Sequence, residues 1–127
     1  MRKRELLHGM DQFTRAYIEC ALWSSTDNSD ESGGLPLDKN YGEADLTIAS
    51  LKKMIKDCQD FQVECATDLA QAGSDPQNGH DFWLTRNGHG AGFWDRDYGD
   101  VGDRLSEACK AYGECWTDVI RGKVHVY

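Results

Sequence analysis

The sequence lacks both a long hydrophobic run and an excess of positive charge. No stretch of its 127 residues approaches the roughly 18 consecutive apolar residues of a membrane-spanning helix. Residues 1–4, Met-Arg-Lys-Arg, lead into Glu5 and His8 rather than into an apolar signal core, so we expect neither secretion nor membrane insertion. Lys and Arg number 14 against 22 Asp and Glu, giving a net charge of −8. Because phosphate backbones are bound mainly through Lys and Arg, direct nucleic-acid binding is disfavoured.

The sequence also lacks an even set of cysteines that would indicate a disulfide framework. Of its five cysteines, Cys58, Cys65 and Cys109 fall on the apolar stripes of predicted helices, where a free thiol acts as a small hydrophobic side chain. This usage is typical of a reducing compartment, and we expect a cytoplasmic protein. The length suits one hydrophobic core, so a single domain is predicted over residues 1–127.

Apolar residues at spacings of three and four predict three helices, over about residues 6–23, 47–73 and 100–113. Thr47 is the candidate N-cap of the second helix, and Asp100 or Asp103 that of the third. Between the first two helices, a segment rich in Ser, Asp and Gly at about residues 24–45 has no periodicity, which predicts a long loop.

Two aromatic runs around a glycine-rich centre predict a β-hairpin over residues 80–96. With residues 87–90 in the turn, Trp83 lies opposite Trp94. Residues 115–120 and 123–127 predict two further strands that extend this hairpin into a sheet. The expected fold class is therefore α+β, with about three helices packed on a small antiparallel sheet built around the central hairpin.

The predicted hairpin concentrates aromatic, charged and amide side chains. A sheet needs one apolar face for its core, so the second aromatic face, with Trp83 and Trp94, is either covered by other elements or open to a ligand. An open face would form a shelf that stacks a planar group and binds its polar atoms. The candidate ligand- or partner-binding residues are Trp83, Arg86, Asn87, His89, Trp94, Asp95 and Arg96.

Signatures of catalysis are missing. The sequence has no G-x-S-x-G, no Walker glycine loop and no G-x-G-x-x-G after a strand. A metal site or an acid-base pair could be supplied by His80, Asp81, His89, Asp95 and Asp97, but their spacing matches no established ligand pattern. We therefore assign no catalytic residue, metal or cofactor, and favour a protein that is not an enzyme.

The negative charge has two interpretations, solubility or an acidic surface that meets a basic partner. The candidate acidic face lies along the second predicted helix and comprises Asp57, Asp60, Glu64 and Asp68.

Two stretches of sequence resemble a family of small bacteriophage-encoded proteins of unassigned function. They are YIECALWSSTD at residues 17–27, followed by Leu37-Asp38, and HDFWLTRNGHGAGFWDR at residues 80–96. The resemblance extends over about residues 13–112. It implies a phage product that acts in the cytoplasm of a bacterial host, and it carries over no catalytic residues.

Three functions are compatible with these features. The first is a non-enzymatic interaction protein that inhibits or redirects a host protein, for example a defence-system component. The second is a protein that sequesters a nucleotide-like signal, with Trp83 or Trp94 stacking on the base and Arg86 or Arg96 binding a phosphate. The third is a small metal-dependent hydrolase. An uncovered Trp face would equally serve a homodimer.

Overall fold

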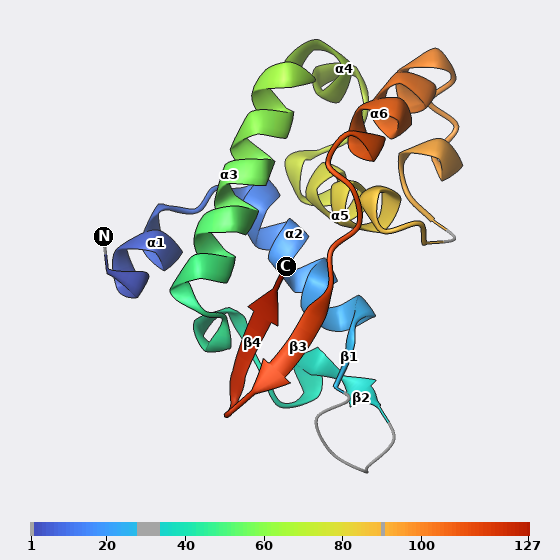
Figure 1. Cartoon of the computed structure of the whole chain (residues 1–127). Coiled ribbons are helices and arrows are strands. Elements are labelled where there is room, and N and C mark those ends of the chain that lie inside the picture. Colours follow the sequence, from blue (N-terminus) through green and yellow to red (C-terminus); the bar gives the residue numbers. More distant parts are fainter. Residues whose placement is uncertain (1, 28–33, 90) are drawn as a thin grey trace.

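The computed structural model describes residues 2–27, 34–89 and 91–127. Within these ranges the chain is mainly helical, with six α-helices and two separate two-stranded sheets (Figure 1). The helices are α1 (Lys3–Gly9), α2 (Gln12–Ser24), α3 (Ile48–Glu64), α4 (Ala66–Gln71), α5 (Asp75–Arg86) and α6 (Asp100–Lys110). The strands are β1 (Thr26–Asp27), β2 (Leu35–Pro36), β3 (Thr117–Ile120) and β4 (Lys123–Val126). Three short 3-10 helices are η1 (Leu37–Lys39), η2 (Glu43–Asp45) and η3 (Phe93–Asp95). The expectation of about three helices on one sheet is therefore wrong.

Two of the predicted helices are each divided by a local break. The first becomes α1 and α2 because Met10 adopts an extended conformation, which ends α1. The Asp11 side chain is the N-cap of α2, since it accepts a hydrogen bond from the Thr14 N–H, 2.8 Å away. The second becomes α3 and α4, with the break at Cys65. Its N-cap is Thr47, as predicted, since the Thr47 hydroxyl accepts from the Ser50 N–H at 3.1 Å.

The third predicted helix corresponds to α6, but its N-cap is Gly99 instead of an aspartate. The predicted loop over residues 24–45 contains regular elements, because β1 pairs antiparallel with β2 and η1 and η2 follow. The part of that loop at residues 28–33 lies outside the described residues.

The predicted central hairpin over residues 80–96 is wrong, because most of its first half belongs to helix α5. Pro76 lies in the first turn of α5, where its missing N–H leaves no hydrogen bond unmade. The helix ends in a Schellman motif: Gly88 has φ of +69°, its N–H donates to the Thr85 carbonyl, and the His89 N–H donates to the Leu84 carbonyl at 3.0 Å. The Asn87-Gly88 pair thus terminates a helix instead of connecting two strands.

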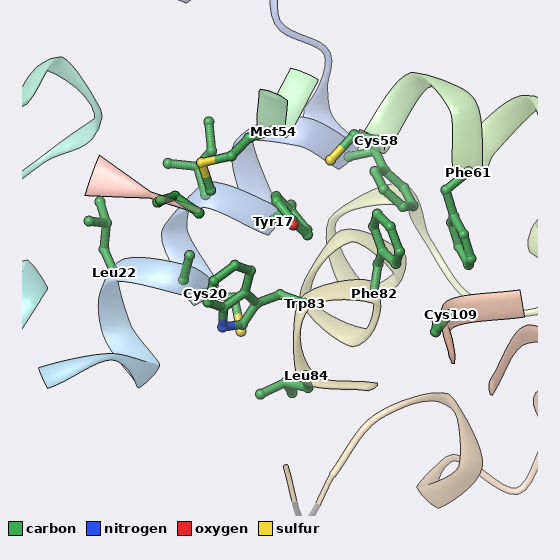
Figure 2. Packing of buried hydrophobic residues seen from close by; sticks show 14 of the residues in the cluster. Tyr17, Cys20, Leu22, Met54, Cys58, Phe61, Phe82, Trp83, Leu84 and Cys109 are labelled. Carbon is green, nitrogen blue, oxygen red and sulfur yellow. The ribbon is translucent and has the colours of Figure 1, made fainter. Parts of the chain in front are cut away.

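The hydrophobic core lies between α2, α3 and α5. Gly79 lets α5 approach α2 closely, since a β-carbon built there would lie 2.1 Å from the Phe13 carbonyl oxygen. Phe61 of α3 stacks on Phe82 of α5, with ring centroids 4.0 Å apart (Figure 2). Tyr17 of α2 contacts the same Phe82 ring. These aromatic contacts fix the position of α5, which contains residues 80–86 of the stretch at 80–96, against α2 and α3.

The C-terminal strands form as predicted, but they do not extend a central hairpin. β3 and β4 pair antiparallel around the turn at residues 121–122. Val124 and Val126 point into the core, and the Val126 N–H donates to the Ser50 hydroxyl at 2.9 Å. This hairpin therefore packs on the start of α3. In the part of the chain that the structure describes, no helix is long and apolar enough to cross a membrane.

Candidate functional site

Arg86 lies near the middle of the stretch at residues 80–96, and each of its three guanidinium nitrogens donates a hydrogen bond within the protein. Its side chain is 1% exposed and donates to the Tyr17 hydroxyl at 3.0 Å and to the Asp57 carboxylate at 2.8 Å. It also donates to the Gly113 and Tyr112 carbonyls, at 2.8 and 2.7 Å. Arg86 therefore joins α2, α3 and the chain after α6 through four hydrogen bonds.

The Asp57 carboxyl is held in its charged form by this arrangement. Burial alone would raise the pKa of Asp57, but hydrogen bonds from Arg86 and Lys53 outweigh burial and lower it. The pair is therefore ionised at neutral pH.

Trp83 and Asn87 also have structural partners. The Trp83 indole is 2% exposed, and its N–H donates to the Ser24 hydroxyl at 2.8 Å. Asn87 donates to the Trp83 carbonyl and accepts from the Cys115 N–H at 2.7 Å. Trp83 consequently offers no open ring face in this conformation, and it shares no shelf with Trp94, whose side chain lies at the surface.

Arg96 pairs with Asp81, a carboxylate with no exposed surface. The guanidinium donates from Nη2 to Oδ1 at 2.9 Å and from Nε to Oδ2 at 3.1 Å. Arg96 and His80 also line a shallow depression of about 360 Å³ with residues 74, 76 and 77. Since Asp81 is committed to Arg96, it is not available beside His80 for acid-base chemistry.

Three of the four acids of the candidate acidic face are ion-paired. Asp57 pairs with Arg86 and Lys53, Asp60 with Lys56, and Asp68 with Arg104, while Glu64 accepts from the Tyr112 hydroxyl and keeps its charge. An acidic residue already paired with a cation attracts a basic partner less than a free one does. Most of this face is therefore a poor site for a basic partner.

Four aspartates lie close in sequence to the exposed Trp94. We give the name Trp94 loop to residues 93–103, which comprise η3, the connection to α6 and the first turn of α6. Trp94 is 53% exposed. Within the described chain, none of the four aspartates of this loop takes part in an ion pair. They are Asp95, Asp97, Asp100 and Asp103, all exposed. Of the Trp94 loop, the predicted site included Trp94, Asp95 and Arg96.

The Trp94 loop is held by anchors that alternate with its exposed residues. Phe93 is fully buried, and its N–H donates to the Thr85 hydroxyl at 3.1 Å. Arg96 is tied to Asp81, and the Tyr98 hydroxyl accepts from the Gln77 amide at 2.6 Å. Gly92 allows the contact between Phe93 and Thr85, because a β-carbon at residue 92 would lie 2.2 Å from the Thr85 hydroxyl oxygen. The anchors present Trp94 and the intervening aspartates outward in a fixed arrangement.

Asp97 adopts φ of +60°, a left-handed conformation that aspartate tolerates better than most residues with a side chain. The chain turns at this residue between the Arg96 and Tyr98 anchors.

The remaining predicted site residues do not converge. His89 is exposed at the end of α5, and no hydrogen bond from its side chain is found within the described ranges. No group of three His, Cys, Asp or Glu side chains among the described residues is arranged to hold a metal ion. The set of His80, Asp81, His89 and Asp95 is therefore not assembled into one centre.

The cysteines provide a first prediction, on thiol reactivity. Cys115 is partly exposed, whereas the other four are buried. Burial raises the pKa of Cys20 to about 12 and that of Cys65 to about 11, and it raises the pKa values of Cys58 and Cys109 strongly as well. At about pH 8 we expect Ellman's reagent to modify one thiol rapidly and the other four only in denaturant. Cys115→Ser should abolish the rapid phase; rapid reaction of a second thiol in the folded protein would contradict this assignment.

No family model, curated protein or solved structure matches the chain.

Proposed function

We propose that this chain is a non-enzymatic interaction protein whose Trp94 loop binds a basic surface on another protein. The observation that carries the proposal is the combination, in one anchored loop, of an exposed Trp with four unpaired aspartates. Tryptophan is enriched among the residues that dominate binding energy at interfaces. Unpaired carboxylates close to it in sequence would select a cationic partner and accelerate association.

The resemblance to phage proteins gives this proposal its biological setting. The partner would be a host protein in the bacterial cytoplasm, such as a defence-system component, which binding would inhibit or redirect. The nucleotide-sequestering alternative has less support, because Trp83 and Arg86 already make internal contacts. The hydrolase alternative lacks an assembled set of ligands or of acid and base groups in the described chain.

The second prediction tests the contribution of Trp94. We expect Trp94→Ala to weaken partner binding by about 2 kcal/mol or more, roughly 30-fold, because the indole would lose its contact area at the centre of the interface. The measurement is a titration of the partner captured from host lysate, with wild type and variant side by side. Trp23→Ala is the matched control, since Trp23 is 62% exposed but lies at the end of α2.

Charge removal provides the second arm of this test. In Asp97→Asn/Asp100→Asn, the partner should bind more weakly and with a smaller dependence on salt. Asn tolerates the left-handed conformation of Asp97 well, so the fold should persist. Glu19→Gln, an exposed acid on α2, is the control. Equal affinities for wild type, Trp94→Ala and the double variant would refute the proposed role of the loop.

A further inference from the structure

Among the residues that the structure describes, half of the Lys and Arg side chains form no ion pair. Of its 14 Lys and Arg residues, seven form salt bridges in the described chain. The other seven are Arg2, Lys3, Arg4, Lys39, Lys52, Arg121 and Lys123. A cation without a carboxylate partner keeps its full attraction for an external anion, so the positions of these seven decide where an anionic partner would bind.

Five of the unpaired cations gather at one end of the molecule, which we call the cationic end. They are Arg2, Lys3, Arg4, Arg121 and Lys123. Leu46 directly follows η2 and forms a β-bridge with Val124 of β4, which places η2 beside the hairpin. Helix α1 packs against η2 and α3. The fold therefore brings α1 near the β3–β4 turn. Burial and the charge of Lys123 both lower the pKa of Lys3, which Asp45 partly opposes. The two lysines are thus close enough to sense each other's charge.

The outer face of the β3–β4 hairpin adjoins this cationic end. Side chains alternate across a strand, so residues 116, 118 and 120 share one face with residues 123, 125 and 127. On this face Trp116 is 68% exposed and Tyr127 is 52% exposed. The two residues lie opposite each other, since each N–H donates to the other's carbonyl, at 3.1 and 2.8 Å. The His125 ring stacks beside Tyr127, with centroids 6.1 Å apart and an interplanar angle of 17°.

This face therefore carries the rings of Trp116, His125 and Tyr127, and unpaired cations lie at its turn end. Lys123 lies on the same face as the rings, and Arg121 is in the turn itself. Asp118 is the one carboxylate side chain on the face. Exposed rings that can stack on bases, next to cations that can bind phosphates, are the two elements of single-stranded nucleic-acid recognition.

We propose that the outer face of the β3–β4 hairpin, together with the cationic end, binds single-stranded nucleic acid. Trp116 and Tyr127 stack on successive bases, while Arg121, Lys123 and Lys3 contact the phosphates. Unstacked bases are required, because paired bases would not expose their faces to the rings. The net charge of −8 does not oppose this binding strongly, because charges act over only about 8–10 Å at physiological ionic strength. Figure 1 shows α1 and the hairpin turn at one end of the molecule and α6, where Asp100 and Asp103 lie, at the other.

The test is fluorescence anisotropy of a labelled oligothymidine of about 20 nucleotides, titrated with the full chain at about 50 mM and about 200 mM salt. We expect binding that weakens as salt rises. Trp116→Ala should weaken it about fivefold or more through lost stacking, and Arg121→Glu/Lys123→Glu should both weaken it and reduce its salt dependence. Quenching of tryptophan fluorescence on binding should be diminished in Trp116→Ala and retained in Trp94→Ala.

Matched controls separate this site from general effects. Trp94→Ala removes an exposed indole from the other end of the molecule, and Lys110→Glu reverses an exposed cation on α6. Both should bind the oligonucleotide as wild type does. The proposal is overturned if wild type fails to bind at low salt, or if Trp116→Ala and Arg121→Glu/Lys123→Glu bind as tightly as wild type. It is also overturned if sedimentation shows that a second copy of the chain covers this face and excludes the oligonucleotide.

Discussion

We expect Gly79→Ala to lower the free energy of unfolding by about 3 kcal/mol, although alanine normally favours a helix over glycine by about 1 kcal/mol. The added β-carbon would lie 2.1 Å from the Phe13 carbonyl oxygen and 3.1 Å from the Tyr17 nitrogen. Both are backbone atoms of α2, so no side-chain rotation relieves the clash and the two helices must separate. Urea denaturation followed by circular dichroism measures the change.

Gly9→Ala is the matched control for this prediction. Gly9 ends α1, and a β-carbon at that position meets no atom within 4 Å. This variant should be as stable as wild type or gain a few tenths of a kcal/mol, as expected for a residue that restricts the unfolded chain. If Gly79→Ala were equally stable, the close contact between α2 and α5 would be wrong.

The second large effect is expected for Arg86→Met. Methionine replaces most of the side-chain volume, but it removes one of the two cations that pair with Asp57 and leaves the Tyr112 and Gly113 carbonyls without their Arg86 donor. Removal of one partner from a buried ion pair costs about 3–5 kcal/mol when the remaining charge is uncompensated. Because Asp57 keeps Lys53 and is 20% exposed, we expect a loss near the lower end of this range. We expect the midpoint of urea unfolding to fall accordingly.

Arg104→Met provides the comparison for Arg86. Arg104 pairs with Asp68 at 2.8 Å, nearly the same distance as in the Arg86–Asp57 pair, but its side chain is 55% exposed. Water can replace that partner, so stability should change little. If Arg86→Met unfolded at the same urea concentration as wild type, Arg86 would have no structural role, and a binding role for its guanidinium would be open again.

Helical periodicity predicted where much of the helical structure lies but not its breaks. Thr47 marked the start of α3 because its hydroxyl and the apolar spacing after it are local signals. The break at Met10 depends on a single extended residue between two helices that share one apolar pattern, which no spacing rule detects.

The hairpin error arose because a glycine-rich segment between two aromatic runs suits two structures. Glycine is favoured in the turns of hairpins, and it is also favoured just beyond the end of a helix. The aromatic residues of α5 suited either interpretation. Pro76 and the spacing of Asn78, Phe82 and Arg86 favour a helix, and this signal was available in the sequence.

The roles of most candidate site residues could not be predicted, because they depend on contacts between residues distant in sequence. Arg86 is used internally by groups from α2, α3 and the chain after α6, which no local pattern connects. Two of the ion pairs on the acidic face could be predicted from the sequence, since Lys53–Asp57 and Lys56–Asp60 have the i,i+4 spacing of helical ion pairs. Trp116 and Tyr127 were visible as aromatic residues of predicted strands, but their shared outer face follows from the register of the pairing.

Residues of α5 build the fold, and we propose that the Trp94 loop binds the partner. The measurement that tests this division most directly is the affinity of Trp94→Ala for the captured partner, determined together with its thermal unfolding. We predict an unfolding temperature like that of wild type and partner binding reduced roughly 30-fold. Unchanged partner binding by a folded Trp94→Ala variant would contradict the account.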